Sequence, residues 1–292
     1  MIERLPDELL TEIIGYAGLD NTHRPSAQNI KRFAPVSRKF ANCTQEILYQ
    51  DIDLVVRNKS TIDTPKTAHK ITCLFQTLLK CPGLRSKVRS LCLVDCRKRG
   101  KSPSAWIGLG EHVRSLALPV EVKYIWLDEA QRRSSEAMLV GLLSVVTNLR
   151  GLHLTNAGNL SLLSRFWGVP SPPILRLLET LKIEPLIEAV RNDYSPVSHF
   201  TGVHGQKNTS LFYHPAIRNL AIMNIHNGYV NDDRLGELQG VSRVTNLVIH
   251  GWIQDMYLAS FLKRFKGLRR FVFIEIPLPI LYFNLAIGLR EH

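Results

Sequence analysis

The sequence predicts an α/β protein in which a short helical N-terminal domain precedes a longer domain of repeated strands and helices. Apolar residues recur at helical spacing through the first 50 residues, and a three-position apolar pattern recurs through the remainder. With 292 residues and 45% hydrophobic content, the chain can bury a substantial core. We therefore divide it into a helical domain, residues 1–50, and a repeat domain, residues 51–292.

The first helix is predicted to begin at Pro6. Proline suits the first helical turn because its missing N–H would be unpaired there, and Asp7 and Glu8 favour the positive end of the helix dipole. Gly18 is expected to end the helix in a left-handed conformation. One apolar stripe at helical spacing joins Leu9, Leu10, Ile13, Ile14 and Ala17.

A second apolar stripe runs through residues 33–47, at alternating steps of three and four. It predicts two or three short helices, interrupted or restarted near Pro35. A unit of only about 50 residues buries little surface by itself, so its apolar faces need the rest of the chain or a partner. This is the pattern of a docking module, although a helical cap for the following domain has similar features. The stripe consists of Phe33, Val36, Phe40, Cys43 and Ile47.

The repeat domain is predicted from one apolar skeleton that occurs seven times. The second and third positions alternate as in a strand, and the intervals between copies leave room for a helix or a loop. Tyr49-x-x-Ile52-x-Leu54 is a possible additional first member. The seven copies are Val88-x-x-Leu91-x-Leu93, Val113-x-x-Leu116-x-Leu118, Leu149-x-x-Leu152-x-Leu154, Leu178-x-x-Leu181-x-Ile183, Ile217-x-x-Leu220-x-Ile222, Val244-x-x-Leu247-x-Ile249 and Leu268-x-x-Phe271-x-Phe273.

Connecting segments of two kinds are predicted between the strands. Helical apolar spacing before Leu149 is repeated in the same register before Leu268, which predicts helices over 139–146 and 258–265. Stretches rich in Pro, Gly, Ser or charged residues predict loops at 97–106, 168–174 and 192–215.

The N-terminal residues resemble the F-box, the motif through which substrate receptors bind the Skp-family adaptor of SCF-type cullin-RING ubiquitin ligases. The resemblance covers residues 2 to about 50 and includes the Leu5-Pro6 start, the Val36-Ser37-Arg38 core and the closing Leu48-Tyr49. It implies that the adaptor contacts Leu5, Pro6, Leu9, Leu10, Ile13, Ile14, Val36, Phe40 and Leu48.

The repeats resemble leucine-rich repeats of the irregular kind often found after an F-box, with parallel strands on a concave face and helices or loops on the convex face. The residues between the inward leucines should then share the concave face. We expect a protein target to dock there, centred on five of these positions: His153, Lys182, Glu184, Met223 and His250. The other residues expected on this face are Ser90, Cys92, Ala117, Thr155, Asn219, Asn246 and Val248.

Together the two resemblances imply a substrate-recognition subunit of an SCF-type E3 ubiquitin ligase. Its partners would be the Skp-family adaptor, the cullin scaffold and a protein target whose identity the sequence leaves open. The chain itself would be no enzyme and would need no cofactor, because the chemistry belongs to other subunits. The alternative is a leucine-rich-repeat scaffold that binds protein or nucleic acid without ligase function.

Composition limits the other classes of function. The net charge of +12, concentrated in part at 97–101, favours acidic partners, but no interleaved aromatic residues support nucleic-acid binding. Five cysteines without a CxxC pair predict reduced, buried thiols, and a zinc site would need a second close pair. No catalytic motif is present, which leaves open only an enzyme with an unrecognised site. Without a leader or a membrane-spanning apolar run, we expect a soluble cytoplasmic or nuclear protein.

Overall fold

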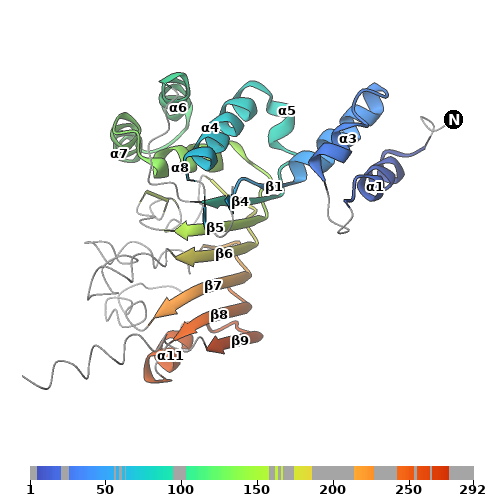
Figure 1. The fold of residues 1–292 in the computed structure, drawn as a ribbon. Helices are drawn as coiled ribbons and strands as arrows, with labels where there is room; N and C mark the ends of the chain where they lie inside the picture. Colours follow the sequence, from blue (N-terminus) through green and yellow to red (C-terminus); the bar gives the residue numbers. More distant parts are fainter. Residues whose placement is uncertain are drawn as a thin grey trace, which may run out of the picture.

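The structure is a computed structural model of the 292-residue chain. It is an α/β fold built on one open, parallel sheet of seven strands (Figure 1). The residues described are 5–20, 26–55, 57–58, 61–62, 64–94, 103–157, 162–163, 166, 174–185, 214–226, 242–252, 255–263 and 265–275.

Three helices form the N-terminal unit: α1 (Asp7–Ala17), α2 (Ala27–Lys31) and α3 (Arg38–Gln50). Serine side chains cap the second and third helices. The Ser26 hydroxyl accepts from the Asn29 N–H at 3.5 Å, and the Ser37 hydroxyl accepts from the Phe40 N–H at 3.4 Å. The helices enclose a small core of their own. This core consists of Leu10, Ile14, Ile30, Phe40 and Cys43.

Gly18 does not adopt the left-handed conformation predicted for it. Its φ is −85°, in the right-handed region. The position favours glycine for another reason, because a Cβ there would lie 2.3 Å from Ile30 Cγ1. Close packing of α1 against α2, and not a helix-ending turn, therefore excludes a larger residue.

The strands of the large sheet follow one another in chain order, so each new strand pairs in parallel with the previous one. The order is β1-β4-β5-β6-β7-β8-β9, and a separate antiparallel pair is formed by β2 (Arg57–Asn58) and β3 (Thr61–Ile62). The first strand lies within the possible additional copy that begins at Tyr49. The seven strands are β1 (Asp51–Asp53), β4 (Ser90–Val94), β5 (Gly151–Ala157), β6 (Thr180–Pro185), β7 (Asn219–His226), β8 (Asn246–Trp252) and β9 (Arg270–Glu275).

The register of the sheet places equivalent positions of the apolar pattern side by side. The second position forms one continuous row across the sheet, and most of its side chains are buried. A one-residue slip would move this row to the other face, so the apolar pattern fixes the register. The row is Ile52, Leu91, Leu152, Leu181, Leu220, Leu247 and Phe271.

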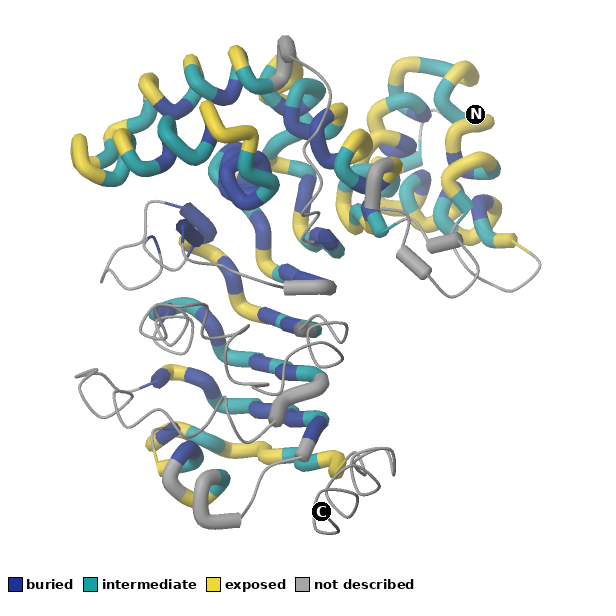
Figure 2. Tube along the Cα trace, turned by 60° about the vertical axis from the view of Figure 1, so that its left-hand side comes forward, coloured by how far each residue is buried: buried dark blue, intermediate teal, exposed yellow. Residues whose placement is uncertain are grey.

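The opposite side of the sheet, the half-exposed face, carries the residues between these apolar positions. In Figure 2 the strands accordingly alternate between buried and partly exposed segments. Polar side chains bond along this face: the Asn219 amide donates to Thr180 Oγ1 at 3.1 Å, and the Asn246 amide donates to Asn219 Oδ1 at 2.6 Å. The row beside the second-position row is Asp53, Cys92, His153, Lys182, Ala221, Val248 and Val272.

Helices α4, α6, α7 and α8 cover the end of the sheet that contains β1, β4 and β5 (Figure 1). They pack on the apolar face in one large core, which includes Phe75, Leu109, Trp126 and Leu142. The helices predicted before Leu149 and Leu268 are both present. The helices outside the N-terminal unit are α4 (Thr64–Lys80), α5 (Pro82–Arg85), α6 (Pro103–Ser115), α7 (Val120–Gln131), α8 (Ser135–Val145) and α11 (Asp255–Leu262).

One of the seven predicted repeat copies is not a strand. Val113 lies in the last turn of α6 and is fully buried, and residues 116–119 connect α6 to α7. Val113 follows Leu109 by four residues, so the two lie on the same buried side of α6. The apolar residues of the connection after α6 complete the three-position pattern by coincidence. Ala117 is therefore absent from the sheet, contrary to the prediction.

The predicted loops are only partly within the described residues. Residues 103–106 belong to α6, so the loop predicted at 97–106 is wrong over that part. Residues 97–102, 168–173 and 192–213 lie outside the described residues. At the ends of the other two predicted loops, Ile174 is a buried bend and His214 precedes a turn.

We expect His214 to make stability depend on pH. Burial lowers the pKa of His214 from 6.5 to about 4, and its Nδ1 accepts the Ala216 N–H at 3.3 Å. Because the unfolded chain binds this proton more readily, stability from His214 is complete above pH 6.5 and is lost as the pH falls toward 4. Between pH 7.5 and 5 the wild type should lose about 2 kcal/mol more unfolding free energy than His214→Gln. Urea titrations at both pH values measure this, and equal losses would contradict it.

Candidate binding surfaces

Four apolar side chains of the N-terminal unit are exposed. On α1 the exposed fractions are 47% for Leu9, 49% for Ile13 and 77% for Tyr16. These residues lie at i, i+4 and i+7, so they form one stripe along the helix. Val36, just before α3, is 62% exposed. We call these four residues the exposed apolar set.

The other residues predicted to contact the adaptor lie deeper in the unit. Leu10, Ile14 and Phe40 are buried in its core, and Leu5 and Leu48 pack partly against that core. The remaining predicted residue, Pro6, is exposed at the start of α1. The apolar stripe predicted for the first helix therefore has two parts. Leu10 and Ile14 pack in the core of the unit, whereas Leu9 and Ile13 are exposed.

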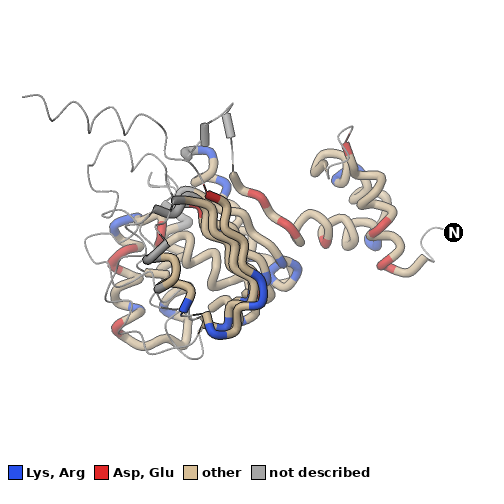
Figure 3. Tube along the Cα trace, turned by 90° about the horizontal axis from the view of Figure 1, so that it is seen from below, with Lys and Arg blue, Asp and Glu red and all other residues tan. Residues whose placement is uncertain are grey.

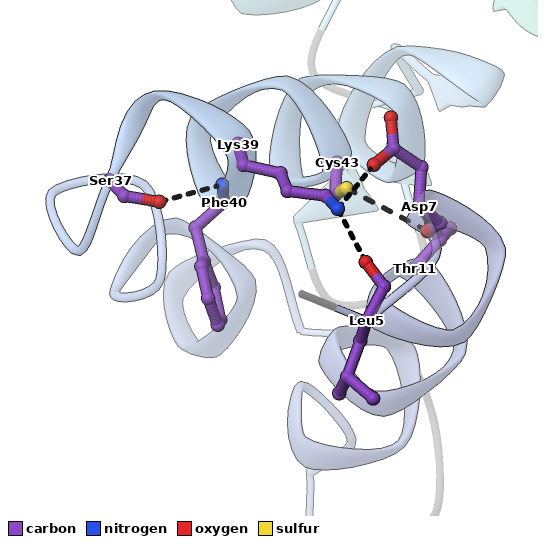
Figure 4. Close-up of polar contacts among 7 residues, drawn as sticks. All are labelled: Leu5, Asp7, Thr11, Ser37, Lys39, Phe40 and Cys43. Atoms are coloured by element: carbon purple, nitrogen blue, oxygen red, sulfur yellow. Dashed lines mark hydrogen bonds and ion pairs between the residues drawn. The ribbon is translucent and has the colours of Figure 1, made fainter. Parts of the chain in front are cut away.

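Lys39 fixes the start of α1 against α3 (Figure 4). Its Nζ donates to the Leu5 carbonyl and lies 3.1 Å from Asp7 Oδ1. The Cys43 thiol, on the same helix, donates to the Asp7 carbonyl at 3.8 Å. The role of Lys39 is not visible in the sequence pattern, because its partners are more than 30 residues away in the chain. These contacts position Leu9 and Ile13 relative to Val36.

The helical unit is joined to the sheet without an intervening linker. Helix α3 ends at Gln50, and β1 begins at Asp51. The Arg89 N–H donates to the Gln50 carbonyl at 2.9 Å, and Lys87 Nζ donates to the Asn42 carbonyl at 3.3 Å. The exposed apolar set and the half-exposed face are thus parts of one continuous scaffold.

Three of the five predicted target-binding residues come together on the half-exposed face. Glu184 Oε1 lies 3.1 Å from His153 Nε2 and 2.8 Å from Lys182 Nζ. His153 and Lys182 are register partners on β5 and β6, which explains their proximity. All three side chains are partly exposed. The cluster therefore presents both signs of charge to the surroundings.

Burial and neighbouring charges set the protonation of this cluster. Burial and the Lys182 charge lower the pKa of His153, outweighing the opposing effects of Glu184 and Asp53. Burial by itself would raise the pKa of Glu184, but hydrogen bonding and the charges of Lys182 and His153 hold it below its ordinary value. At neutral pH we therefore expect a neutral imidazole beside an ionised carboxylate.

Met223 and His250 lie elsewhere on the sheet. Met223 is on β7 and His250 is on β8, and both are partly exposed. Neither forms a described hydrogen bond or ion pair with the cluster on β5 and β6. The five predicted residues thus occupy one sheet, but only three are in mutual contact.

Cys92 completes the cluster and was not among the five predicted binding residues. Its sulfur lies 3.3 Å from His153 Nδ1, and the two residues are register partners on β4 and β5. The repeated pattern contained the signal for this contact, because Cys92, His153 and Lys182 occupy the same position in the first, third and fourth copies.

Basic residues gather at the ends of the strands nearest the N-terminal unit (Figure 3). Arg89, Arg150, Arg218 and Arg269 each immediately precede a strand. Arg150 forms an exposed ion pair with Glu179, with 3.1 Å between Nη1 and Oε1. This row, the basic edge, carries part of the positive charge, whereas the predicted basic loop 97–101 lies outside the described residues.

The four described cysteines form no disulfide with one another. Cys43 is buried, as predicted, and Cys92 is partly buried. Cys73 on α4 and Cys81 just after it are exposed, contrary to the prediction of buried thiols. Among the described residues, no group of three or more His, Cys, Asp or Glu side chains could hold a metal ion. No helix in the same part of the chain combines the length and apolar character needed to cross a bilayer.

Comparison with known proteins gives no relative for this chain: no family model, curated protein or solved structure matches it.

Proposed function

We propose that this chain is the substrate-recognition subunit of an SCF-type cullin-RING ubiquitin ligase. Its N-terminal helices bind a Skp-family adaptor, and its repeat domain, an irregular leucine-rich-repeat solenoid, binds a protein target. The proposal rests on the resemblance of residues 2 to about 50 to the F-box, including Leu5-Pro6 and Val36-Ser37-Arg38.

The observation that supports it best is the exposed apolar set. Leu9, Ile13, Tyr16 and Val36 are exposed although the unit has enough buried apolar residues to form its own core. Several exposed apolar side chains on a unit this small, three of them in one stripe along α1, are typical of a protein interaction site. They lie within the segment that resembles the F-box, which supports an adaptor-binding role for them.

Direct continuity between helix and sheet supports the mechanism. A receptor of this type contributes no reacting group and acts by holding its target near a ubiquitin-charged enzyme. Such positioning needs a stiff connection between the adaptor-binding and target-binding surfaces. The absence of a linker between Gln50 and Asp51, and the bonds from Arg89 and Lys87, support such a connection.

Reconstitution tests the adaptor half of the proposal. The purified chain, mixed with a Skp-family adaptor and the N-terminal part of a cullin, is expected to elute as one ternary complex in size-exclusion chromatography. Elution of the chain apart from both proteins would overturn the proposal. The adaptor alone with the cullin provides the reference elution position.

Substitution on the half-exposed face tests the target half. A chain in which five positions are changed to alanine should keep the adaptor but lose its target by at least about tenfold in capture, since removing several contacts costs well over 1.4 kcal/mol. Proximity labelling in cells by the wild-type and substituted chains measures the difference. Unchanged capture of an adaptor-dependent target would show that the target binds elsewhere. The five positions are His153, Lys182, Glu184, Met223 and His250.

The basic edge favours a second candidate, a scaffold that binds an acidic protein or nucleic acid without ligase function. Arg89, Arg150 and Arg269 are exposed there. Binding through such a row would weaken steeply with salt and fall on charge reversal at Arg150 and Arg269. This candidate would be excluded if the chain bound no acidic ligand at low salt. It would also be excluded if binding of an acidic ligand were unchanged at high salt and after charge reversal at Arg150 and Arg269.

A further inference from the structure

Three chemically complementary side chains lie in a line on adjacent strands of the half-exposed face. Cys92 on β4 faces one nitrogen of His153 on β5, with Sγ 3.3 Å from Nδ1. Glu184 on β6 faces the other nitrogen, with Oε1 3.1 Å from Nε2. The order is therefore thiol, imidazole and carboxylate.

We propose that Cys92 is a nucleophilic thiol activated by His153, which Glu184 positions, and that it takes electron-poor alkenes conjugated to a carbonyl group as covalent ligands. A nucleophile beside a base that is oriented by a third group is recognised by geometry and roles, whatever the fold. The inference does not rest on the proposed ligase function, although His153 and Glu184 are also among the predicted target-binding residues.

The geometry gives each nitrogen of the imidazole a distinct role. With Nδ1 toward the thiol, the neutral ring accepts the S–H proton there, and its Nε2–H is on the side of the Glu184 carboxylate. The 3.1 Å contact to Glu184 is close but not aligned as a hydrogen bond. Loose alignment is common before a ligand is bound, and the contact strengthens when the ring becomes charged.

The reaction balances without an added oxidant or reductant. The sulfur attacks the β-carbon of the alkene, so that a C–S bond forms and the C=C π bond breaks. The S–H proton passes to His153 Nδ1, and Glu184 stabilises the resulting imidazolium. The proton is then returned to the α-carbon, which restores the neutral imidazole and leaves a stable thioether.

The surroundings of His153 favour the base form. The charged groups around it are Asp53 on β1 and both Lys182 and Glu184 on β6, with the Cys92 thiol on β4. Burial and Lys182 lower the pKa of His153, so the ring is neutral and able to accept a proton at pH 7. A shared metal site is excluded because Cys92 and Glu184 approach opposite nitrogens of one ring.

The test is the rate at which acrylamide adds to each cysteine of the full chain. Cys92 and Cys96 occur in one tryptic peptide, 90–97, so the measurement uses a Cys96→Ser background. Cys73 and Cys81 then fall in separate peptides, which mass spectrometry quantifies in the same sample. At pH 7 Cys92 should react about tenfold faster than exposed Cys81, because general-base assistance outweighs its partial burial.

The pH profile distinguishes base assistance from simple exposure. The Cys92 rate should rise through the lowered pKa of His153 and then level off, whereas the Cys81 rate should continue to rise with its thiolate fraction. His153→Gln should abolish the advantage over Cys81. Glu184→Gln should slow Cys92 about threefold and move the inflection to lower pH, because the charge that raises the pKa of His153 is lost.

Cys73 is the matched control, because its sulfur lies 3.6 Å from His69 Nε2 on α4. Both residues are exposed to water, and no described carboxylate contacts His69, so His69→Gln should change the Cys73 rate less than about twofold. Circular dichroism must show each variant folded. A Cys92 rate no higher than that of Cys81, a rate kept in His153→Gln, or a profile without an inflection would overturn the proposal.

Discussion

Replacing Leu9 and Ile13 by aspartate is expected to weaken binding of the Skp-family adaptor by about thirtyfold or more, a loss of ~2 kcal/mol. The two side chains are 47% and 49% exposed, so the free chain can carry the new charges in water. On binding, those charges would have to leave water against an apolar surface. Isothermal titration of the purified adaptor into the chain measures the loss.

The control for this prediction lies one position further along the same helix. Leu10 is fully buried, and Leu10→Ala should lower the unfolding free energy by about 2 to 5 kcal/mol through the cavity that it leaves. The double aspartate variant should keep its unfolding free energy within about 1 kcal/mol, as is usual for surface changes. Adaptor binding as tight as that of the wild type would contradict an interface on this side of α1.

The apolar pattern of α1 shows how far periodicity can predict a surface. Leu9, Leu10, Ile13 and Ile14 form one stripe in the sequence, and helical spacing correctly places them on neighbouring parts of one helix. Only the packing of α2 and α3 decides that Leu10 and Ile14 become core. Periodicity identifies the apolar side of a helix, but the tertiary structure decides which of its residues become core and which stay exposed.

The repeat pattern agrees with the register of the sheet, because equivalent positions of the copies that form strands are neighbours. It was wrong for Val113, where a helix stripe continuing into a connection satisfies the same three positions. The pattern also placed Cys92 and His153 at equivalent positions, yet their contact depends on which strands are adjacent. Because the copy between them is helical and adds no strand, β4 and β5 pair directly.

Leu152→Ala is expected to lower the unfolding free energy by about 2 to 5 kcal/mol, because a buried leucine in a packed row leaves a cavity when it is truncated. Leu152 is 2% exposed and lies between Leu91 and Leu181 in the second-position row. Val248→Ala, on the half-exposed face, is the control and should cost much less. Urea unfolding followed by circular dichroism measures both losses, and a loss below about 1 kcal/mol for Leu152→Ala would contradict its role in the core.

The corresponding change in β8, Leu247→Ala, tests whether the sheet behaves as a repeat array. Leu247 is fully buried, so Leu247→Ala should lower the unfolding free energy by a similar amount. If the strands unfold as one cooperative unit, both variants shift a single transition. In a solenoid each repeat contacts only its neighbours, so weakening one end can unfold that end first. A second, earlier transition in Leu247→Ala but not in Leu152→Ala would therefore support the solenoid, because α4 and α8 lie at the opposite end of the sheet (Figure 1).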